Sequence, residues 1–327
     1  MAMPSVDAVH TTPPSGAERT ASPAEKVPPL AHRVRPARVL AVIAVGLGAA
    51  MLVHALVTNP NFQWSVVGQY LTTNTIVVGV LTTLELTVLS MAIGIALGVV
   101  LGVMSQSANA LVSGAGWLYV WFFRGTPLLV QIIFWYNLAS LYPKVSVGIP
   151  FGPSFVHGAT NSMITPFAAA VLSLGLNEGA YMAEIVRGGL LGVDRGQAEA
   201  AHSLGLTRFQ AMRRIILPQA MRLIVPPTGN QTISMLKSTA LVSVISMTEL
   251  LHAVQQIYAT TYQTIPLLIV ASLWYLAVTS VLSVGQYFLE RKLGRGNRSH
   301  ASGRGGLVRQ IIRALRVRPD SPEVSAS

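Results

Sequence analysis

The sequence predicts an all-α membrane protein with about six transmembrane helices, and three observations support this prediction. Hydrophobic residues make up 51% of the 327-residue chain and charged residues only 11%, whereas soluble domains have roughly 25% charged residues. Lys and Arg gather in alternate segments of the chain. Asp, Glu, Lys and Arg are missing from four long stretches, which lie between Arg38 and Glu85, Glu85 and Arg124, Lys144 and Glu178, and Glu249 and Glu290.

The uncharged stretches are long enough to hold membrane-spanning helices. Crossing about 30 Å of hydrocarbon at about 1.5 Å per residue takes about 20 apolar residues. Arg124, Gly125 and Pro127 interrupt the third candidate span, where the helix is expected to bend, and Lys237 interrupts the fifth. The six predicted spans are 39–58, 76–104, 118–142, 164–188, 223–249 and 266–289.

The Lys and Arg residues predict the orientation of these spans. The segment 1–38 holds 5 of them, 187–222 holds 6 and the tail from Arg291 holds 9, whereas 59–75 and 250–265 hold none. Cytoplasmic loops carry an excess of Lys and Arg. Six spans with both termini in the cytoplasm fit this alternation.

Both ends of the chain are predicted to be cytoplasmic tails. Residues 1–38 contain seven of the 19 prolines and are typical of a disordered segment. The run 39–58 is interpreted as a retained span rather than a signal peptide, because 38 residues precede it and no A-x-A-like cleavage site follows it. The tail 293–327 is basic, and its segment 307–316 fits either a helix on anionic lipid or a solvated tail.

A stripe of small residues is expected to pack against another helix. Gly94, Gly98 and Gly102 recur every four residues, and Ser90 extends the series. On a helix this spacing places them on one face, where small residues let a second helix approach closely. The alternative is a chance register in a glycine-rich membrane protein.

The polar segment 194–218 predicts two short helices that protrude from the cytoplasmic side. Asp194 and Gln197 form a capping pattern that begins the first helix, and Gly205 lies where a left-handed residue ends one. Thr207 and Gln210 form a second capping pattern, and Pro218 is expected to end the second helix.

This segment resembles the EAA loop of the permease subunits of bacterial ABC importers. The matching positions are Glu199, Ala200, Ala201, Gly205, Ile215, Leu217 and Pro218. Four further segments are similar to the polar amino-acid permeases of the histidine, glutamate, glutamine and arginine group: 123–131, 176–188, 217–220 and 236–245. The resemblance covers about residues 75–292. The chain departs from the family at Ser238 and Ala240, which leaves a local partner for Lys237 in question.

The resemblance implies a five-helix importer domain over 75–292, with 39–58 as an added N-terminal helix. It implies that Glu199 anchors the loop on a separate ATP-binding subunit, that Ala200 and Ala201 form the contact face, and that Gly205 makes the turn. The implied partners are a dimer of ATP-binding subunits that hold ATP and Mg²⁺, a second permease subunit of the same or a homologous chain, and an extracytoplasmic amino-acid-binding protein. The implied location is the bacterial inner membrane.

Five residues are candidates to line a translocation path: Arg124, Asn177, Tyr181, Glu184 and Lys237. Ionisable groups at membrane depth are costly and usually face protein or water. The spacings 177 to 181 and 181 to 184 place three of these residues on one helix face. A structural pair between Glu184 and Arg187 is the alternative for Glu184. Arg124 fits a cavity wall, a gate or a cytoplasmic anchor.

Other functions find less support in the sequence. No G-x-x-x-x-G-K-[ST] phosphate loop is present, so the chain is not expected to hydrolyse ATP or to hold a cofactor. The main alternative is a stand-alone secondary amino-acid transporter or channel, which the EAA pattern disfavours. A receptor would need a soluble sensory domain, and a nucleic-acid binder would not distribute its basic residues by membrane topology.

Overall fold

The computed structural model describes residues 36–148 and 154–293. The chain divides into two compact units, one formed by 1–51 with 303–327 and the other by 52–302. The first predicted tail, up to residue 35, and the predicted amphipathic segment 307–316 lie outside the described residues. All elements after α1 belong to the second unit.

The first span is α1 (Pro36–Thr58), an apolar helix with no buried residue in its candidate membrane window. A helix that is apolar on all sides suits a lipid environment. It is followed by the short helices η1 (Pro60–Phe62) and α2 (Trp64–Tyr70). The indole of Trp64 donates a 2.8 Å hydrogen bond to the carbonyl of Leu56 and ties the end of α1 to α2.

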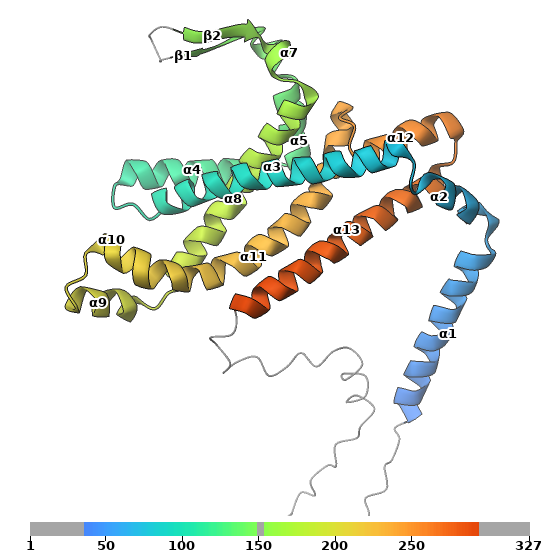
Figure 1. Ribbon diagram of the computed structural model, residues 1–327, viewed down its shortest axis with the longest axis horizontal. Coiled ribbons are helices and arrows are strands. Elements are labelled where there is room, and N and C mark those ends of the chain that lie inside the picture. The colour runs from blue at the N-terminus through green and yellow to red at the C-terminus, as the bar shows by residue number, and fades with distance from the viewer. Residues whose placement is uncertain (1–35, 149–153, 294–327) are drawn as a thin grey trace, which may run out of the picture. The chain divides into compact units, whose positions relative to one another are not determined.

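The most extensive helix contact joins α3 (Asn74–Met104) and α8 (Pro166–Leu191), which cross in Figure 1. Gly94, Gly98 and Gly102 on α3 face α8. A Cβ atom added at Gly98 would lie 2.3 Å from the Cβ of Met182, and one added at Gly94 would lie 2.5 Å from Cγ of Glu178. The backbones therefore approach so closely that no side chain fits between them at these positions.

The third predicted span, 118–142, is bent at Gly125–Pro127 as expected, and its helices run from residue 110 to residue 136. It forms α4 (Ala110–Gly125) and α5 (Leu128–Tyr136), which meet at an angle of 99°. Pro127 has no amide hydrogen to continue α4 and disfavours a helical conformation for the residue before it. Thr126 accordingly has an extended backbone, with ψ of 141°.

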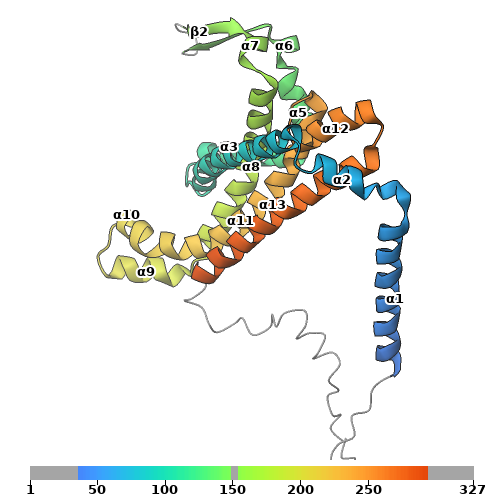
Figure 2. The same ribbon diagram turned by 45° about the vertical axis from the view of Figure 1, so that its right-hand side comes forward.

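A small β-hairpin follows, which the sequence did not predict within the otherwise helical fold. After α6 (Leu138–Leu141), strand β1 (Lys144–Gly148) pairs antiparallel with β2 (Ser154–Ala159), with Lys144 opposite Ala159. Helix α7 (Thr160–Met163) leads from the hairpin to α8. In both Figure 1 and Figure 2 the hairpin lies at the opposite end of the second unit from the helices α9 (Arg195–Ser203) and α10 (Arg208–Ala211).

The segment 194–218 forms two short helices as predicted, but Pro218 does not end the second one. Helix α9 (Arg195–Ser203) is followed by α10 (Arg208–Ala211), a π-helical turn η2 (Met212–Ile216) and α11 (Leu217–Ser238). Pro218 lies in the first turn of α11, where a missing amide hydrogen is tolerated. The chain therefore runs helically from α10 into α11.

The fifth span is also longer and more irregular than the predicted 223–249. Helix α11 passes into η3 (Thr239–Ile245), and α12 (Leu250–Thr261) follows after a 45° bend. Pro226 and Pro227 lie inside α11. Gln286 on α13 (Thr264–Leu293) donates hydrogen bonds to the Pro226 carbonyl at 3.3 Å and to Asn230 at 3.0 Å beside them.

Three helices in the described residues are long and apolar enough to cross a membrane, or up to five when each bent pair counts as one span. The three are α1, α3 and α13, and the bent pairs are α4 with α5 and α10–η3 with α12. The remaining predicted span, 164–188, forms the 26-residue α8, which carries Asn177, Glu178 and Glu184 and does not meet the same apolar criterion.

Candidate translocation path and coupling surface

A cavity of about 480 Å³ lies where α8 and α11 meet the break between α4 and α5. We call it the central cavity. Arg124, Asn177 and Tyr181, three of the five predicted path residues, line it. Its complete lining is Arg124, Gly125, Thr126, Pro127, Leu128, Asn177, Glu178, Tyr181, Gln231, Ser234, Met235 and Ser238.

Asn177 and Gln131 hold the break between α4 and α5 together. A helix that ends inside a protein leaves carbonyl groups that need donors. The amide of Asn177 donates a 2.9 Å hydrogen bond to the Phe123 carbonyl, and the amide of Gln131 donates to the same carbonyl at 3.0 Å. Gln131 also donates to the Thr126 hydroxyl at 2.7 Å. The amide nitrogen of Asn177 is thus engaged in fixing the cavity wall.

Glu178 supplies a buried carboxylate to the central cavity. It is only 4% exposed, and its described polar partner is Gln231, whose amide lies 3.3 and 3.4 Å from the two carboxylate oxygens. Glu178 is one residue away from the predicted stripe of Asn177, Tyr181 and Glu184, so helical spacing alone did not favour it. Its position against Gly94 explains why it faces inward.

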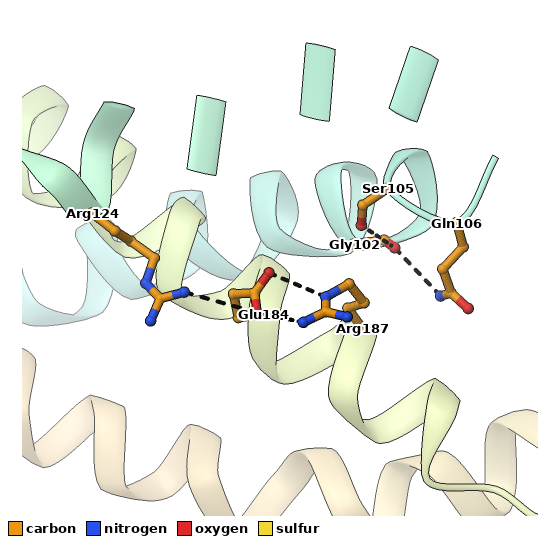
Figure 3. A network of polar contacts seen from close by, with 6 residues as sticks. All are labelled: Gly102, Ser105, Gln106, Arg124, Glu184 and Arg187. Carbon is orange, nitrogen blue, oxygen red and sulfur yellow. Dashed lines mark hydrogen bonds and ion pairs between the residues drawn. The ribbon is translucent and has the colours of Figure 1, made fainter. Parts of the chain in front are cut away.

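Glu184 lies on a second cavity of about 870 Å³, which adjoins the first. Arg187 binds both of its carboxylate oxygens, at 3.1 and 2.7 Å, as the structural-pair alternative predicted. Arg124 approaches the same carboxylate at 3.8 Å (Figure 3). The second cavity is lined by Ser105, Ala110, Ser113, Gly114, Gly116, Trp117, Val120, Trp121, Arg124, Gly125, Tyr181, Glu184 and Arg187.

Lys237, the fifth predicted path residue, shares neither of these cavities with Asn177 or Glu184. Within the described part of the chain, Lys237 lines neither of these two cavities and its side chain is exposed on α11. Neighbouring positions on a helix point about 100° apart, so Ser234 and Ser238 face the central cavity and Lys237 does not.

The short helices α9 and α10 form a compact pair (residues 194–216), which we call the coupling hairpin after the role that the resemblance implies for it. Gly205 has φ of +75°, the left-handed conformation predicted for it. Thr207 and Gln210 form the predicted capping box. Asp194 caps α9 through the amide of Gly196, at 2.7 Å, rather than through a box with Gln197. The side chain of Gln197 instead accepts a 3.2 Å hydrogen bond from Gln219 on α11.

The predicted contact face of the coupling hairpin is only partly on its surface. Glu199 and Ala200 are exposed, whereas Ala201 is fully buried and packs inside the hairpin. Ile215 is half-buried, and Leu217 and Pro218 are exposed. Two large apolar side chains without a predicted role, Leu204 and Phe209, are 78% and 71% exposed. Large apolar residues near the Gly205 turn of an otherwise polar segment were the sequence signal that could have predicted this exposed apolar surface.

A helical membrane domain with a broken span, a polar cavity at the break and a protruding two-helix loop defines a class of solute-transport permeases. Residues 94–295 match the family described as the binding-protein-dependent transport system inner membrane component, and the chain belongs to this family.

The relatives of the chain are amino-acid permeases. It is 44% identical over 271 residues to the arginine transport system permease protein ArgU of Corynebacterium glutamicum, covering 82% of this chain and 83% of ArgU. It is 33% identical over 234 residues to the glutamine transport system permease protein GlnP of Escherichia coli, covering 71% and 98%. A crystal structure of an amino acid ABC transporter with histidines matches with a TM-score of 0.57 at 36% identity, covering 67% of this chain and 94% of that one.

These findings confirm the resemblance on which the sequence analysis relied. The chain is a membrane-spanning permease subunit of an amino-acid ABC importer. Nothing in the comparisons favours a stand-alone transporter or channel.

Proposed function

We propose that this permease carries a cationic amino acid of the arginine type through the central cavity. The observation that carries the proposal is the buried carboxylate of Glu178 on the cavity wall. A carboxylate at membrane depth is costly unless a cation or a hydrogen-bond donor meets it. The guanidinium or ammonium group of such a substrate would supply the opposite charge. The identity of 44% to an arginine permease agrees with this choice.

The other walls of the central cavity suit the carboxylate end of the substrate. Helix α5 begins at Leu128 without a side-chain hydrogen bond at its N-cap, Pro127. The free amide groups and the dipole of a helix N-terminus favour an anion, and broken membrane helices use this arrangement for substrate carboxylates. Arg124 adds a formal positive charge on the same side of the break. The cavity therefore offers an acidic wall and a basic wall to one amino acid.

Transport measurements test this assignment. Vesicles holding the assembled importer and its binding protein should take up arginine in preference to glutamine and glutamate. Glu178→Gln should reduce arginine uptake about tenfold or more, because it removes a buried charge partner whose pairing contributes about 1.5–3 kcal/mol. Glu85→Gln, on an exposed position of α3, is the matched control. Equal uptake of arginine and glutamine, together with an unaffected Glu178→Gln variant, would contradict the proposal.

The proposed coupling element is the coupling hairpin, which docks on a separate ATP-binding subunit. Exposed Glu199 would serve as a polar anchor, and the exposed apolar side chains Leu204 and Phe209 would fill a groove of that subunit. ATP and Mg²⁺ would then be held by the partner, so this chain would have no ATPase site of its own. The hydrogen bond between Gln197 and Gln219 would pass motion from α9 to α11, which carries Gln231 of the central cavity.

Co-purification tests the docking role. Gly205→Val carries about 1–2 kcal/mol of left-handed strain and should distort the tip of the coupling hairpin. Together with Glu199→Arg it should abolish recovery of the ATP-binding subunit while the permease stays in the membrane. Gly188→Val on α8, where a Cβ would meet nothing within 4 Å, is the control. Normal recovery and transport by the double variant would refute the docking role.

The Lys and Arg distribution supports the proposed orientation, with both termini and the coupling hairpin in the cytoplasm. A reporter that is active only outside the cytoplasm, fused after Ser327, should give no signal. A strong signal would refute this orientation. The remaining partners proposed are a second permease subunit and an extracytoplasmic amino-acid-binding protein.

A further inference from the structure

Glu184 lies between two arginines, and its contact with Arg187 is shorter than its contact with Arg124. Figure 3 shows Arg124 and Arg187 approaching its carboxylate from opposite sides. Arg187 makes two hydrogen bonds, at 3.1 and 2.7 Å, one turn further along the same helix. The nearest nitrogen of Arg124 is 3.8 Å away, which is too long for a hydrogen bond. Arg124 can therefore leave Glu184 while the carboxylate keeps its pair with Arg187.

Arg124 belongs to the wall that separates the two cavities. Arg124, Gly125 and Tyr181 line both the central cavity and the second cavity. The guanidinium carbon of Arg124 lies 5.4 Å from the ring centroid of Tyr181, a cation–π distance. Along α8, Glu184 is six residues beyond Glu178, a rise of about 9 Å toward the coupling hairpin. The shared wall thus lies between the two cavities, on the side of the central cavity that is nearer to the coupling hairpin along α8.

The backbone beside Arg124 is fixed, so the movable part of this wall is a side chain. Asn177 and Gln131 both donate to the carbonyl of Phe123, and Gln131 also donates to Thr126. These contacts hold the chain on either side of Arg124. The long Arg124 side chain, with its exposed fraction of 43%, has room to change rotamer without moving this backbone.

We propose that Arg124 is a latch that closes the central cavity toward the coupling hairpin and that Glu184 holds it shut. Arg187 orients the carboxylate and competes with Arg124 for it. The proposal rests on the proposed function for the direction of transport, but the closure itself depends on this chain alone. A passing amino acid must displace Arg124 from Glu184. The three side chains together carry a net charge of +1, so the wall attracts the carboxylate group of the amino acid.

Thiol labelling of the assembled importer tests the latch, because the chain has no native cysteine. A single cysteine in place of Ser234 reports on the central cavity, and one in place of Ser113 reports on the second cavity. A membrane-impermeant thiol reagent is applied from the side of the coupling hairpin, without substrate. Glu184→Gln should raise the labelling rate at position 234 about two- to fivefold, the range expected for a partly exposed ion pair. Labelling at position 113 and in the Glu85→Gln control should not change.

Two further variants separate a latch from a merely structural ion pair. Arg124→Gln should raise labelling at position 234 as much as Glu184→Gln, and the double variant should raise it no further, because both changes remove one interaction. Arg187→Gln should slow labelling, since it frees Glu184 for Arg124. A loosened structure would instead speed labelling in all three variants.

The proposal is overturned if Glu184→Gln leaves the rate at position 234 unchanged, or if Arg187→Gln speeds labelling as Glu184→Gln does. The readout is the accessibility of a cysteine and not the identity of the cargo. An importer that prefers glutamine over arginine would disprove the proposed substrate and leave the latch standing.

Discussion

Two membrane spans of this permease are bent, and the two bends are built in opposite ways. The 99° break between α4 and α5 is bordered by two cavities and by the side chains of Arg124 and Glu178. The 45° bend between η3 and α12 is sealed. There Glu249 is fully buried and accepts hydrogen bonds from the amides of Leu251 and His252 and from the hydroxyl of Tyr275.

The difference between the two bends lies in how many hydrogen-bond donors each carboxylate finds within its own chain, and this number separates a structural carboxylate from one that can bind a substrate. The oxygens of Glu249 have three donors within 2.9 Å, so this carboxylate is satisfied by its own chain. Glu178 has Gln231 at 3.3 Å or more and borders open space. A buried polar group that lacks strong partners in its own chain is the one suited to accept a ligand.

The largest effect on stability is expected at the sealed bend. Glu249→Ala leaves three partly buried donors without an acceptor, each at a cost of up to about 1–3 kcal/mol. The midpoint of thermal unfolding in detergent should fall strongly, and the yield of folded protein should fall with it. Tyr275→Phe removes one of the three donors and should have a much smaller effect. If Glu249→Ala unfolded at the same temperature as the unmodified protein, the sealed character of this bend would be disproved.

A smaller loss of stability is expected at the open break. Asn177→Ala removes one hydrogen bond to the Phe123 carbonyl, while Gln131 still donates to it. The loss should be about 0.5–1.5 kcal/mol, measured by the same thermal unfolding experiment. Adding Gln131→Ala should cost more than the sum of the two single changes, because the carbonyl then has neither donor. Additive losses would show that the two amides do not act as one clamp.

The smallest expected effect comes from single cysteine substitutions, whose thiol reactivity compares the water access of the two bends. Thr83 is buried beside the sealed bend, where its hydroxyl accepts a 3.1 Å hydrogen bond from the amide of Leu250. Ser234 lines the central cavity. A cysteine at position 234 should react with a small water-soluble thiol reagent, and one at position 83 should stay inert. Comparable reactivity at both positions would remove the distinction between an open and a sealed bend.

The sequence predicted the fold more fully than the site, for identifiable physical reasons. Runs without charge predict membrane helices, because burying a charge in lipid is costly whatever the tertiary structure. The glycine at 205 and the capping box at Thr207 are local features, so four or five residues of sequence suffice to read them. Arg124, Gly125 and Pro127 indicated a bend in the third span, but its angle depends on donors 46 and 54 residues away from their partners.

The path residues were harder to predict, because their roles depend on the neighbouring helices. Helical spacing grouped Asn177, Tyr181 and Glu184, yet the crossing with α3 turns Glu178 inward as well. Lys237 was assigned to the path as an ionisable group inside a span, but Ser234 and Ser238 line the central cavity from α11 and Lys237 does not. Gln231 carries no charge and has no spacing signal, so only the packed structure reveals it beside Glu178.

The glycine stripe on α3 also limits where this protein can move. At Gly98 and Gly102 the backbones of α3 and α8 leave no space for even one additional carbon atom. Two helices in such contact cannot slide or roll past each other without a steric clash, because packed interiors are hardly compressible. The two helices must therefore move together as one rigid body. Any rearrangement that exposes the central cavity alternately to the two sides of the membrane must therefore keep α3 and α8 together, and it draws on parts outside this contact, such as the Arg124 side chain and α11, with its two internal prolines.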